Sequence, residues 1–127
     1  MSTVELTKDT FEETVTADGI VLVDFWAAWC GPCRQFAPVY ERTSEQNSDI
    51  TFGKVDTEDQ PELSAAFEIR SIPTLMIFRD GVMIFSQPGA LPEPALVDLI
   101  GQARGLDMDE VRKQIAGHAD HASGPGA

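Results

Sequence analysis

The chain has 127 residues, a length that favours a single domain with one hydrophobic core. It carries 21 acidic and 9 basic residues, a net charge of −12, and such a surface repels a phosphate backbone, so nucleic-acid binding is disfavoured as the main function. A high net charge keeps a protein soluble, and it can also steer the protein toward basic partners. The sequence leaves both explanations of the charge open.

No stretch of the chain is suited to crossing a membrane. The longest strongly apolar run, residues 20–23, is far shorter than the roughly 20 residues of a spanning helix and is followed by Asp24. The first residues have no basic start and no small-residue cleavage site, which a secretory signal would need. We therefore expect a cytoplasmic protein that does not interact with membranes.

Apolar spacing and turn signals predict alternating strands and helices. In chain order we expect a strand at 3–6, a helix at 8–16, a strand at 20–26, a helix at 32–45, a strand at 50–55 and a helix at 61–67. The strand at 20–26 is apolar on both faces, which is typical of the middle of a sheet covered on both sides. Pro32 suits the first turn of the helix that follows, and Pro38 should kink that helix.

The rest of the domain is predicted to be a hairpin followed by a helix. Strands at 75–78 and 82–85 flank the turn Arg79-Asp80-Gly81, and a helix covers 93–104. A strand–helix–strand start requires a parallel pair, and the hairpin adds antiparallel strands. The sequence therefore predicts an α/β fold with a mixed central β-sheet flanked by helices on both faces.

Gly105 ends the last of these helices, so we expect a domain over residues 1–105 and a C-terminal extension over 106–127. Three apolar residues of the extension are spaced as on one face of a short helix: Met108, Val111 and Ile115. The tail from Gly117 is rich in Gly, Ala and His and is expected to be disordered. The extension packs on the domain, lies idle or contacts a partner. We expect the chain to be a monomer.

The two cysteines, Cys30 and Cys33, are separated by only two residues. A pair so close forms a very small loop and adds little stability, so its spacing suits chemistry better than architecture. Disulfide exchange needs one thiolate to attack and a second thiol to release the mixed disulfide. If a helix begins near Pro32, its unpaired N–H groups and its dipole stabilise a thiolate at Cys30. Cys30 is therefore the expected nucleophile and Cys33 the resolving thiol.

A structural zinc site and a pair of inert buried cysteines are the alternative interpretations. Zinc needs about four ligands, and the chain has no second cysteine pair. Its two histidines, His118 and His121, lie in the tail, where two imidazoles would bind a metal only weakly. We therefore expect no metal site.

Asp24 interrupts the apolar strand at 20–26, shortly before Cys30. One interpretation is a solvated carboxylate at the edge of the sheet. The other is a buried carboxyl with a raised pKa that serves Cys33 as a general base through water. Lys54, on the neighbouring predicted strand, is a candidate partner for this carboxylate.

Several motifs occur in a fixed order along about residues 4–104. The stretch at 24–34 reads Asp-Phe-Trp-Ala-Ala-Trp-Cys-Gly-Pro-Cys-Arg. The further motifs, in chain order, are Ala37-Pro38, Lys54-Val55-Asp56, Arg70-Ser71-Ile72-Pro73-Thr74, Asp80-Gly81 and Gly89-Ala90-Leu91. Together these stretches resemble the thioredoxin family of bacterial type, and they are specific because they recur in order through most of the chain.

The resemblance implies roles for particular residues. Asp24 and Lys54 would assist the cysteines, and Pro73 would form a cis peptide bond packed against them, although an ordinary trans turn proline is the alternative. The backbone around Ile72 would pair with an extended substrate segment. The substrate-binding residues would be Trp29, Gly31, Pro32, Ile72, Thr74, Gly89 and Ala90. Trp26 would pack beneath the active site or be a plain core aromatic.

The Gly31-Pro32 pair resembles the reducing members of the superfamily, because oxidising relatives usually carry a histidine there, which favours the thiolate form. The resemblance implies a general protein-disulfide reductase with no bound cofactor. Its Cys30–Cys33 disulfide would be recycled by an NADPH-dependent thioredoxin reductase. The alternatives are an isomerase or oxidant and, from another class, a redox-inactive binding module or holdase that uses the apolar surface. Pro88 departs from the family pattern and would stiffen its loop.

Overall fold

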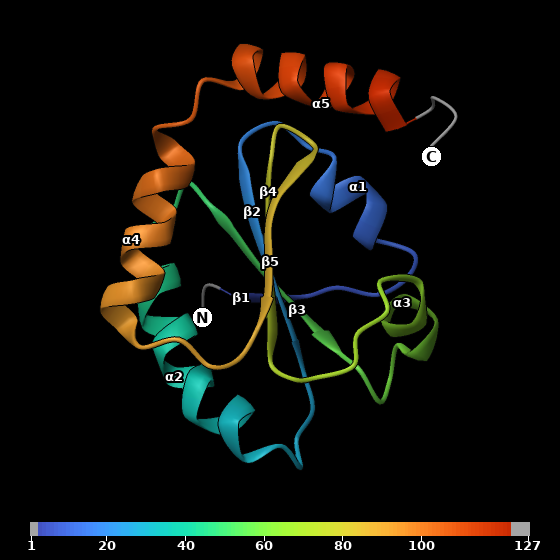
Figure 1. The fold of residues 1–127 in the computed structure, drawn as a ribbon. Coiled ribbons are helices and arrows are strands. Elements are labelled where there is room, and N and C mark those ends of the chain that lie inside the picture. Colours follow the sequence, from blue (N-terminus) through green and yellow to red (C-terminus); the bar gives the residue numbers. More distant parts are fainter. Residues whose placement is uncertain (1–2, 123–127) are drawn as a thin grey trace.

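The computed structural model describes residues 3–122, with side chains described up to residue 117. The elements, in chain order, are β1 (Thr3–Glu5), α1 (Phe11–Val15), β2 (Ile20–Trp26), α2 (Gly31–Glu45), β3 (Thr51–Asp56), α3 (Pro61–Ala66), β4 (Thr74–Arg79), β5 (Val82–Pro88), α4 (Glu93–Arg104) and α5 (Met108–Ala122). This alternation confirms the predicted α/β class (Figure 1).

The five strands form a mixed sheet in the order β1-β3-β2-β4-β5. β3 pairs parallel with both β1 and β2, whereas β4 pairs antiparallel with both β2 and β5. The central place of β2 explains why its sequence is apolar on both faces. Because β2 and β3 are parallel, their carboxyl ends lie at the same end of the sheet. The loop that leads into α2 starts there.

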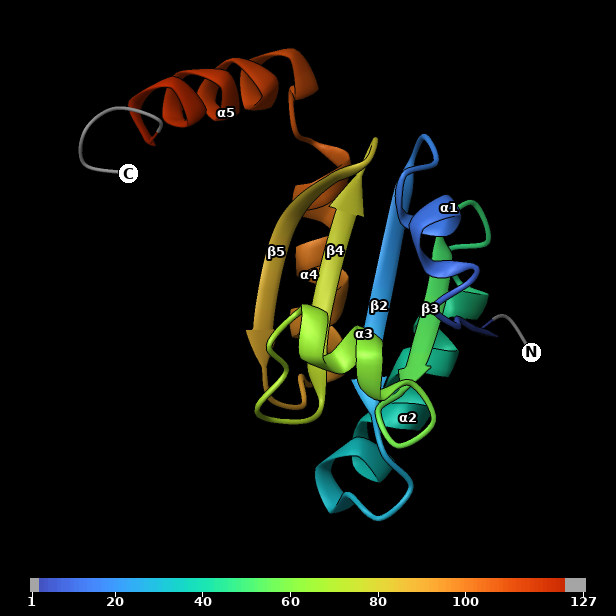
Figure 2. The same ribbon diagram turned by 90° about the vertical axis from the view of Figure 1, so that its right-hand side faces the viewer.

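Helices cover both faces of the sheet, as predicted. α2 and α4 pack on one face, where Leu22, Phe36 and Ile100 belong to one core cluster. α1 packs on the other face through Phe11, with Phe25 of the sheet and half-buried Leu63 of α3. Figure 2 shows α1 and α3 on the near side of the sheet and α4 on its far side.

Residues of β2 alternate between these two faces. Leu22 belongs to the core under α2 and α4, whereas Val23 and Phe25 belong to the core under α1. Asp24 therefore points to the α2 side together with Leu22 and Trp26. This alternation places a carboxyl group beneath the helix that carries the cysteines.

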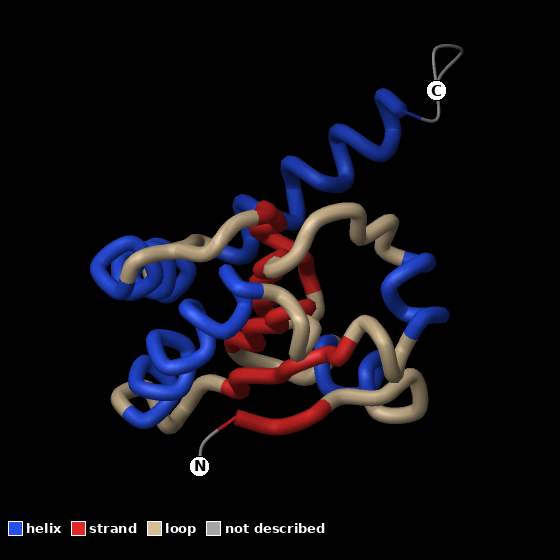
Figure 3. The backbone as a smooth tube through the Cα atoms, turned by 90° about the horizontal axis from the view of Figure 1, so that it is seen from below, coloured by secondary structure: helices blue, strands red, loops and turns tan. Residues whose placement is uncertain are grey.

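The C-terminal extension forms the helix α5, which continues past Gly117, where the sequence predicts a disordered tail to begin. The start of α5 is fixed by buried Met108 and by the Asp107 carboxylate, whose Oδ1 accepts hydrogen bonds from the N–H groups of Asp109 and Glu110. A glycine inside a helix costs only about 1 kcal/mol, so Gly117 does not end it. Beyond its first turns α5 projects from the body of the domain (Figure 3).

The described residues bear on the expected tail and on membrane spans. Of the tail expected from Gly117 onward, the backbone up to Ala122 belongs to α5, whereas residues 123–127 and the side chains of His118 and His121 lie outside the described part. Within residues 3–122, no helix is both long enough and apolar enough to cross a membrane.

Candidate active site

The two cysteines lie at the start of α2. Cys30 is the N-cap residue, with an extended backbone (φ −85°, ψ 116°), and its Sγ accepts a hydrogen bond from the N–H of Cys33 at 3.2 Å. Pro32 follows in the first turn, where a missing N–H costs nothing. Cys30 and Cys33 form a disulfide, with their Cα atoms 5.2 Å apart. In the reduced chain the same N–H groups and helix dipole favour a thiolate at Cys30.

Both cysteine side chains are largely covered, with exposed fractions of 4 % for Cys30 and 2 % for Cys33. They form a small apolar cluster with Ala27, against which Trp26 and Ile72 pack. Cys33 lies inside the helix, on the face that points to the sheet, whereas Cys30 lies at the helix start, next to the exposed Trp29. A partner that approaches from outside therefore meets Cys30 first.

Two loops come together beside the disulfide. The Ile72–Pro73 peptide bond is cis, as the resemblance implies, so the trans alternative is wrong. The carbonyl oxygen of Ile72 lies 3.6 Å from Cys30 Sγ. The N–H of Gly89 donates to the carbonyl of Pro73 at 2.7 Å, and Gly89 has a φ of +110°, which glycine adopts without strain.

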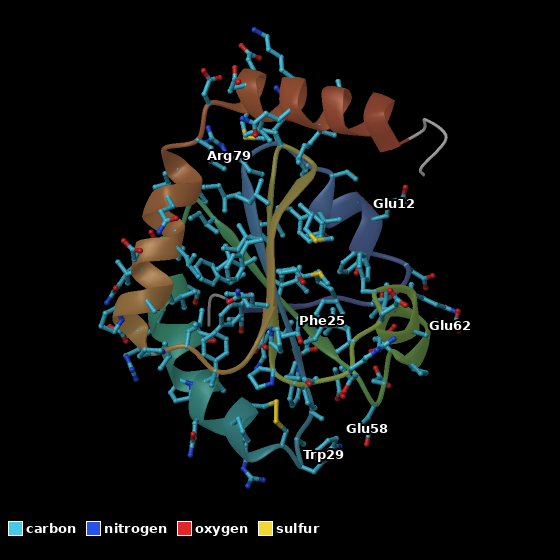
Figure 4. The ribbon with its side chains drawn as sticks, in the orientation of Figure 1. Glu12, Phe25, Trp29, Glu58, Glu62 and Arg79 are labelled. Carbon is cyan, nitrogen blue, oxygen red and sulfur yellow. A yellow bond between two sulfur atoms is a disulfide. The ribbon has the colours of Figure 1, made fainter. Side chains whose placement is uncertain are left out.

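A mostly apolar surface surrounds the cysteines. Trp29 is 65 % exposed, and Figure 4 shows it beside the disulfide, at the opposite end of the molecule from α5. The other residues of this surface are exposed Pro32, Gly89 and Ala90 and half-buried Gly31 and Ile72. Thr74 differs, because it is buried and its Oγ1 donates to the carbonyl of Ser71. Its side chain holds the loop in place and does not line the surface.

Asp24 is buried beneath α2, with an exposed fraction of 1 %, so the interpretation as a solvated carboxylate is wrong. Neither of its carboxylate oxygens has a hydrogen-bond partner. Burial raises the pKa of Asp24 from 3.8 to about 7; the charge of Lys54 opposes this rise and that of Glu5 adds to it. A carboxyl group that titrates near neutral pH can both accept and donate a proton there.

Lys54 is the register partner of Asp24 on the adjacent strand β3. Its Nζ lies over the ring of Trp26, 4.6 Å from the ring centroid, an arrangement that favours a cation. The Trp26 Nε1 is itself buried without a partner. The structure thus brings Asp24, Lys54 and Trp26 together on one face of the sheet, next to the cysteine cluster.

The comparisons with known proteins agree with this geometry. The thioredoxin family model matches residues 2–102. The chain is 69 % identical over 115 residues to the protein of Streptomyces coelicolor described as putative thioredoxin 2, a match that covers 91 % of this chain and 86 % of that protein. The chain belongs to the thioredoxin family.

Other thioredoxins are similar at lower identity. Thioredoxin 1 of Synechococcus elongatus is 45 % identical over 97 residues, which are 75 % of this chain and 91 % of the cyanobacterial one. The crystal structure of the Malassezia sympodialis thioredoxin has a TM-score of 0.73 at 33 % identity and covers 80 % of this chain and 90 % of its own. As a member of this family, the chain is a protein-disulfide oxidoreductase that works through its own Cys30–Cys33 disulfide.

Sequence reasoning missed two carboxylates of this thioredoxin site. Glu58, in the loop after β3, accepts a hydrogen bond from Trp29 Nε1 at 2.9 Å. Glu5, on β1, is the register partner of Lys54 on the side away from Asp24. Neither has a local sequence signal, because an acidic residue in a polar stretch of an acidic chain is unremarkable. Among the side chains that the structure describes, no three or more potential metal ligands gather in one place.

Proposed function

We propose that this thioredoxin is a general reductant of protein disulfides in the cytoplasm, acting as a monomer. Cys30 is the attacking thiolate, Cys33 resolves the mixed disulfide, and Asp24 exchanges a proton with Cys33. The observation that carries the assignment is the hydrogen bond from the N–H of Cys33 to Cys30 Sγ at the start of α2. This bond and the helix dipole favour negative charge on Cys30, whereas among the described residues no hydrogen bond is donated to Cys33 Sγ.

The reaction balances as two sulfur exchanges. The Cys30 thiolate attacks one sulfur of the substrate disulfide, forms a Cys30–substrate disulfide, and releases the other substrate sulfur as a thiolate. Cys33 then passes its proton to Asp24 and attacks Cys30 Sγ, which forms the Cys30–Cys33 disulfide and releases the second substrate thiolate. The substrate gains two electrons and takes up two protons, and the dithiol loses two electrons.

The surface around Trp29, Pro32 and Ala90 supports a role in holding the substrate. Its exposed apolar atoms suit an extended segment next to a substrate cysteine, and the backbone around Ile72 offers hydrogen-bonding groups for strand addition. Lys54 keeps a positive charge near Asp24 and so limits how strongly Asp24 holds its proton.

The oxidised pair must be reduced again before the next cycle. We propose that NADPH supplies the two electrons through a thioredoxin reductase. The reductase would bind the chain at the surface that holds the substrate, around the Cys30–Cys33 disulfide. The proposed cytoplasmic location suits this cycle, because the cytosol is a reducing compartment that keeps dithiols reduced. The Gly31-Pro32 pair between the cysteines, without histidine, fits a reductant better than an oxidant.

The redox potential of the Cys30–Cys33 couple, titrated against a thiol–disulfide buffer, tests the direction of electron flow. A potential well below that of the glutathione pool supports the reductase. A potential near those of isomerases or stronger oxidants contradicts it and assigns the chain to disulfide formation. The absence of a reversible two-electron couple would leave the binding module or holdase, which should survive replacement of both cysteines by serine.

Trapping variants test the roles of the two cysteines. Cys33→Ser should accumulate a mixed disulfide with a disulfide-containing protein, because attack proceeds and resolution does not. Cys30→Ser is the matched control and should accumulate none. The reverse pattern would exchange the two roles.

A further inference from the structure

The side chains of Asp24, Trp26 and Lys54 lie on the same face of the sheet. Asp24 and Trp26 are two residues apart on β2, and the side chains of a strand alternate between its two faces. Lys54 of β3 is the register partner of Asp24, and register partners on neighbouring strands point to the same face. An ion pair with Asp24 would therefore be the simplest arrangement for the Lys54 ammonium.

The Lys54 ammonium does not form this pair. Its Nζ lies 4.6 Å from the centroid of the Trp26 ring, whereas neither carboxylate oxygen of Asp24 has a hydrogen-bond partner. The side chain of Lys54 thus reaches along the sheet toward Trp26 and not straight across to Asp24. The face of an indole ring attracts a cation, most strongly where water is excluded, so the half-buried ring competes with the carboxyl for the ammonium.

Trp26 also contacts the cysteines. It packs against the small apolar cluster that Cys30 and Cys33 form with Ala27. The same side chain therefore contacts the redox-active pair and the cation opposite Asp24. Packing beneath the active site would explain the first contact, and it does not explain the second, which is made with a charged group.

The elements that cover Asp24 from α2 and β4 bring no cation to it. From α2 the buried titratable groups are Cys33 and Tyr40, and the Tyr40 hydroxyl donates to the carbonyl of Gly53 at 2.8 Å. On β4 the register partner of Asp24 is apolar Leu75. Neither element therefore offers a positive charge to the carboxyl.

The strands on the other side bring two acids and one cation. Asp56 of β3 is the register partner of Trp26, and its Oδ1 accepts a hydrogen bond from the N–H of Glu58. Glu5 of β1 is the register partner of Lys54. Of the groups named around Asp24 in the described part of the chain, Lys54 is thus the one cation. The place of its ammonium decides how strongly a negative charge on Asp24 is stabilised.

We propose that Trp26 is a positioning residue for Lys54: its ring holds the ammonium beside the cysteine cluster and keeps it from forming an ion pair with Asp24. Asp24 then has a positive charge nearby without being fixed in a salt bridge, so its carboxyl stays free to exchange a proton. The raised pKa of Asp24, about 7, agrees with this arrangement, because burial outweighs the opposing charge of Lys54. The meaning for catalysis rests on the proposed proton exchange between Asp24 and Cys33.

The first test uses the unmodified oxidised chain and measures the NMR shifts of the Lys54 ε-protons. Protons over the face of an aromatic ring resonate upfield, so these protons should lie upfield of those of Lys113, which is exposed on α5. Lys54 ε-protons at the same position as those of Lys113 would overturn the inference without any variant.

Trp26→Leu removes the ring, and the carboxyl of Asp24 is titrated by NMR in the full oxidised chain. The released ammonium can then pair with Asp24 and favour its charged form, so the midpoint should move down by about half a pH unit. Trp26→Phe retains a ring and should keep most of the original midpoint. Trp29→Leu removes the exposed tryptophan, which does not hold Lys54, and should leave the Asp24 midpoint unchanged.

A Lys54→Met background separates the effect of the cation from the effect of burial. A smaller side chain at position 26 also brings water closer to Asp24, and this change alone lowers the midpoint. In the Lys54→Met background the shift caused by Trp26→Leu should therefore fall below half its size, because only the effect of burial is left.

The outcomes separate the placement of Lys54 from the catalytic role of Asp24. An unchanged Asp24 midpoint in Trp26→Leu overturns the inference, and so does an equal shift in the Lys54→Met background, since the ring would then act by burial alone. A shifted midpoint whose matching pH profile of disulfide reduction stays in place supports the inference and instead contradicts the proposed role of Asp24 in catalysis.

Discussion

The indole Nε1 of Trp29 donates a hydrogen bond to Oε1 of Glu58 at 2.9 Å and connects the loop before α2 to the loop after β3. Trp29 is otherwise exposed, so this bond fixes the orientation of the largest apolar side chain beside the disulfide. A bond to a charged acceptor at the surface contributes on the order of 1 kcal/mol. The orientation of Trp29, on the surface proposed to hold substrate, thus depends on a carboxylate from a different part of the sequence.

Glu58→Ala should therefore lower kcat/KM for a protein disulfide substrate by up to about fivefold, the factor that corresponds to roughly 1 kcal/mol. A small-molecule disulfide, which does not rest on Trp29, should be reduced at an unchanged rate. Asp59→Asn, at the adjacent exposed carboxylate, is the control for charge alone. An equal loss with both substrates would show that Glu58 acts on the cysteines and not on the surface.

The raised pKa of Asp24 makes stability depend on pH. The folded chain binds this proton more tightly than the unfolded chain, so its stabilising effect is complete below pH 3.8 and is lost as the pH rises toward about 7. The difference between a pKa of 3.8 in the unfolded chain and about 7 in the folded chain corresponds to roughly 4 kcal/mol. Asp24→Asn should flatten this dependence and raise the free energy of unfolding at pH 8 by a few kcal/mol. Urea unfolding of both oxidised proteins at pH 5 and pH 8 measures it, and parallel pH profiles would contradict it.

The sequence predicts the fold and the centre of the site for identifiable reasons. An apolar strand interrupted by Asp24 marks that carboxyl as a candidate site residue, although only its burial in the structure excludes a solvated one, and the close spacing of Cys30 and Cys33 suits exchange better than stabilisation. The turn at Asp80-Gly81 is also predicted from its residues, and both adopt the positive φ that this turn requires. Each of these features is encoded within a few neighbouring residues.

The remaining parts of the site depend on contacts between distant segments. Glu5 lies beside Lys54, the register partner of Asp24, only because β1 pairs with β3 in one particular register. Glu58 reaches Trp29 only because the loops after β2 and β3 end at the same edge of the sheet. Thr74 carries a substrate-binding role by resemblance, yet the structure turns its hydroxyl to Ser71. No local pattern predicts such pairings.

Arg79, at the end of β4, holds the junction between α4 and the extension. Its Nη1 donates to the carbonyls of Ala103 and Leu106 at 2.7 Å each, and to that of Arg104 at 3.2 Å. Ala103 and Arg104 lie in the last turn of α4, where carbonyls have no partner within the helix, and Leu106 lies just beyond it. Arg79→Met should lower the free energy of unfolding by roughly 2–4 kcal/mol, because the two N–H groups of Nη1, shared among these three carbonyls, make charge-assisted bonds that are lost.

Arg79→Lys is the matched variant, since one ammonium can replace part of this bonding, and it should recover part of the stability. Urea unfolding measures both proteins. The redox potential of Cys30–Cys33 should stay unchanged in each, because the junction lies at the other end of the sheet (Figure 1). A changed potential would mean that the junction is coupled to the active site.

Removal of residues 107–127 tests whether the extension takes part in catalysis. Met108 is the buried side chain of α5 up to residue 117, and Val111 is half-buried, so truncation after Leu106 should lower the free energy of unfolding by about 1–3 kcal/mol. Reduction of a protein disulfide should stay within about twofold, because α5 and the disulfide lie at opposite ends of the molecule (Figure 4). Met108→Ala in the full chain isolates the packing contribution and should account for most of the lost stability. A folded truncated chain that has lost its activity toward protein substrates, but not toward a small disulfide, would assign α5 to partner binding.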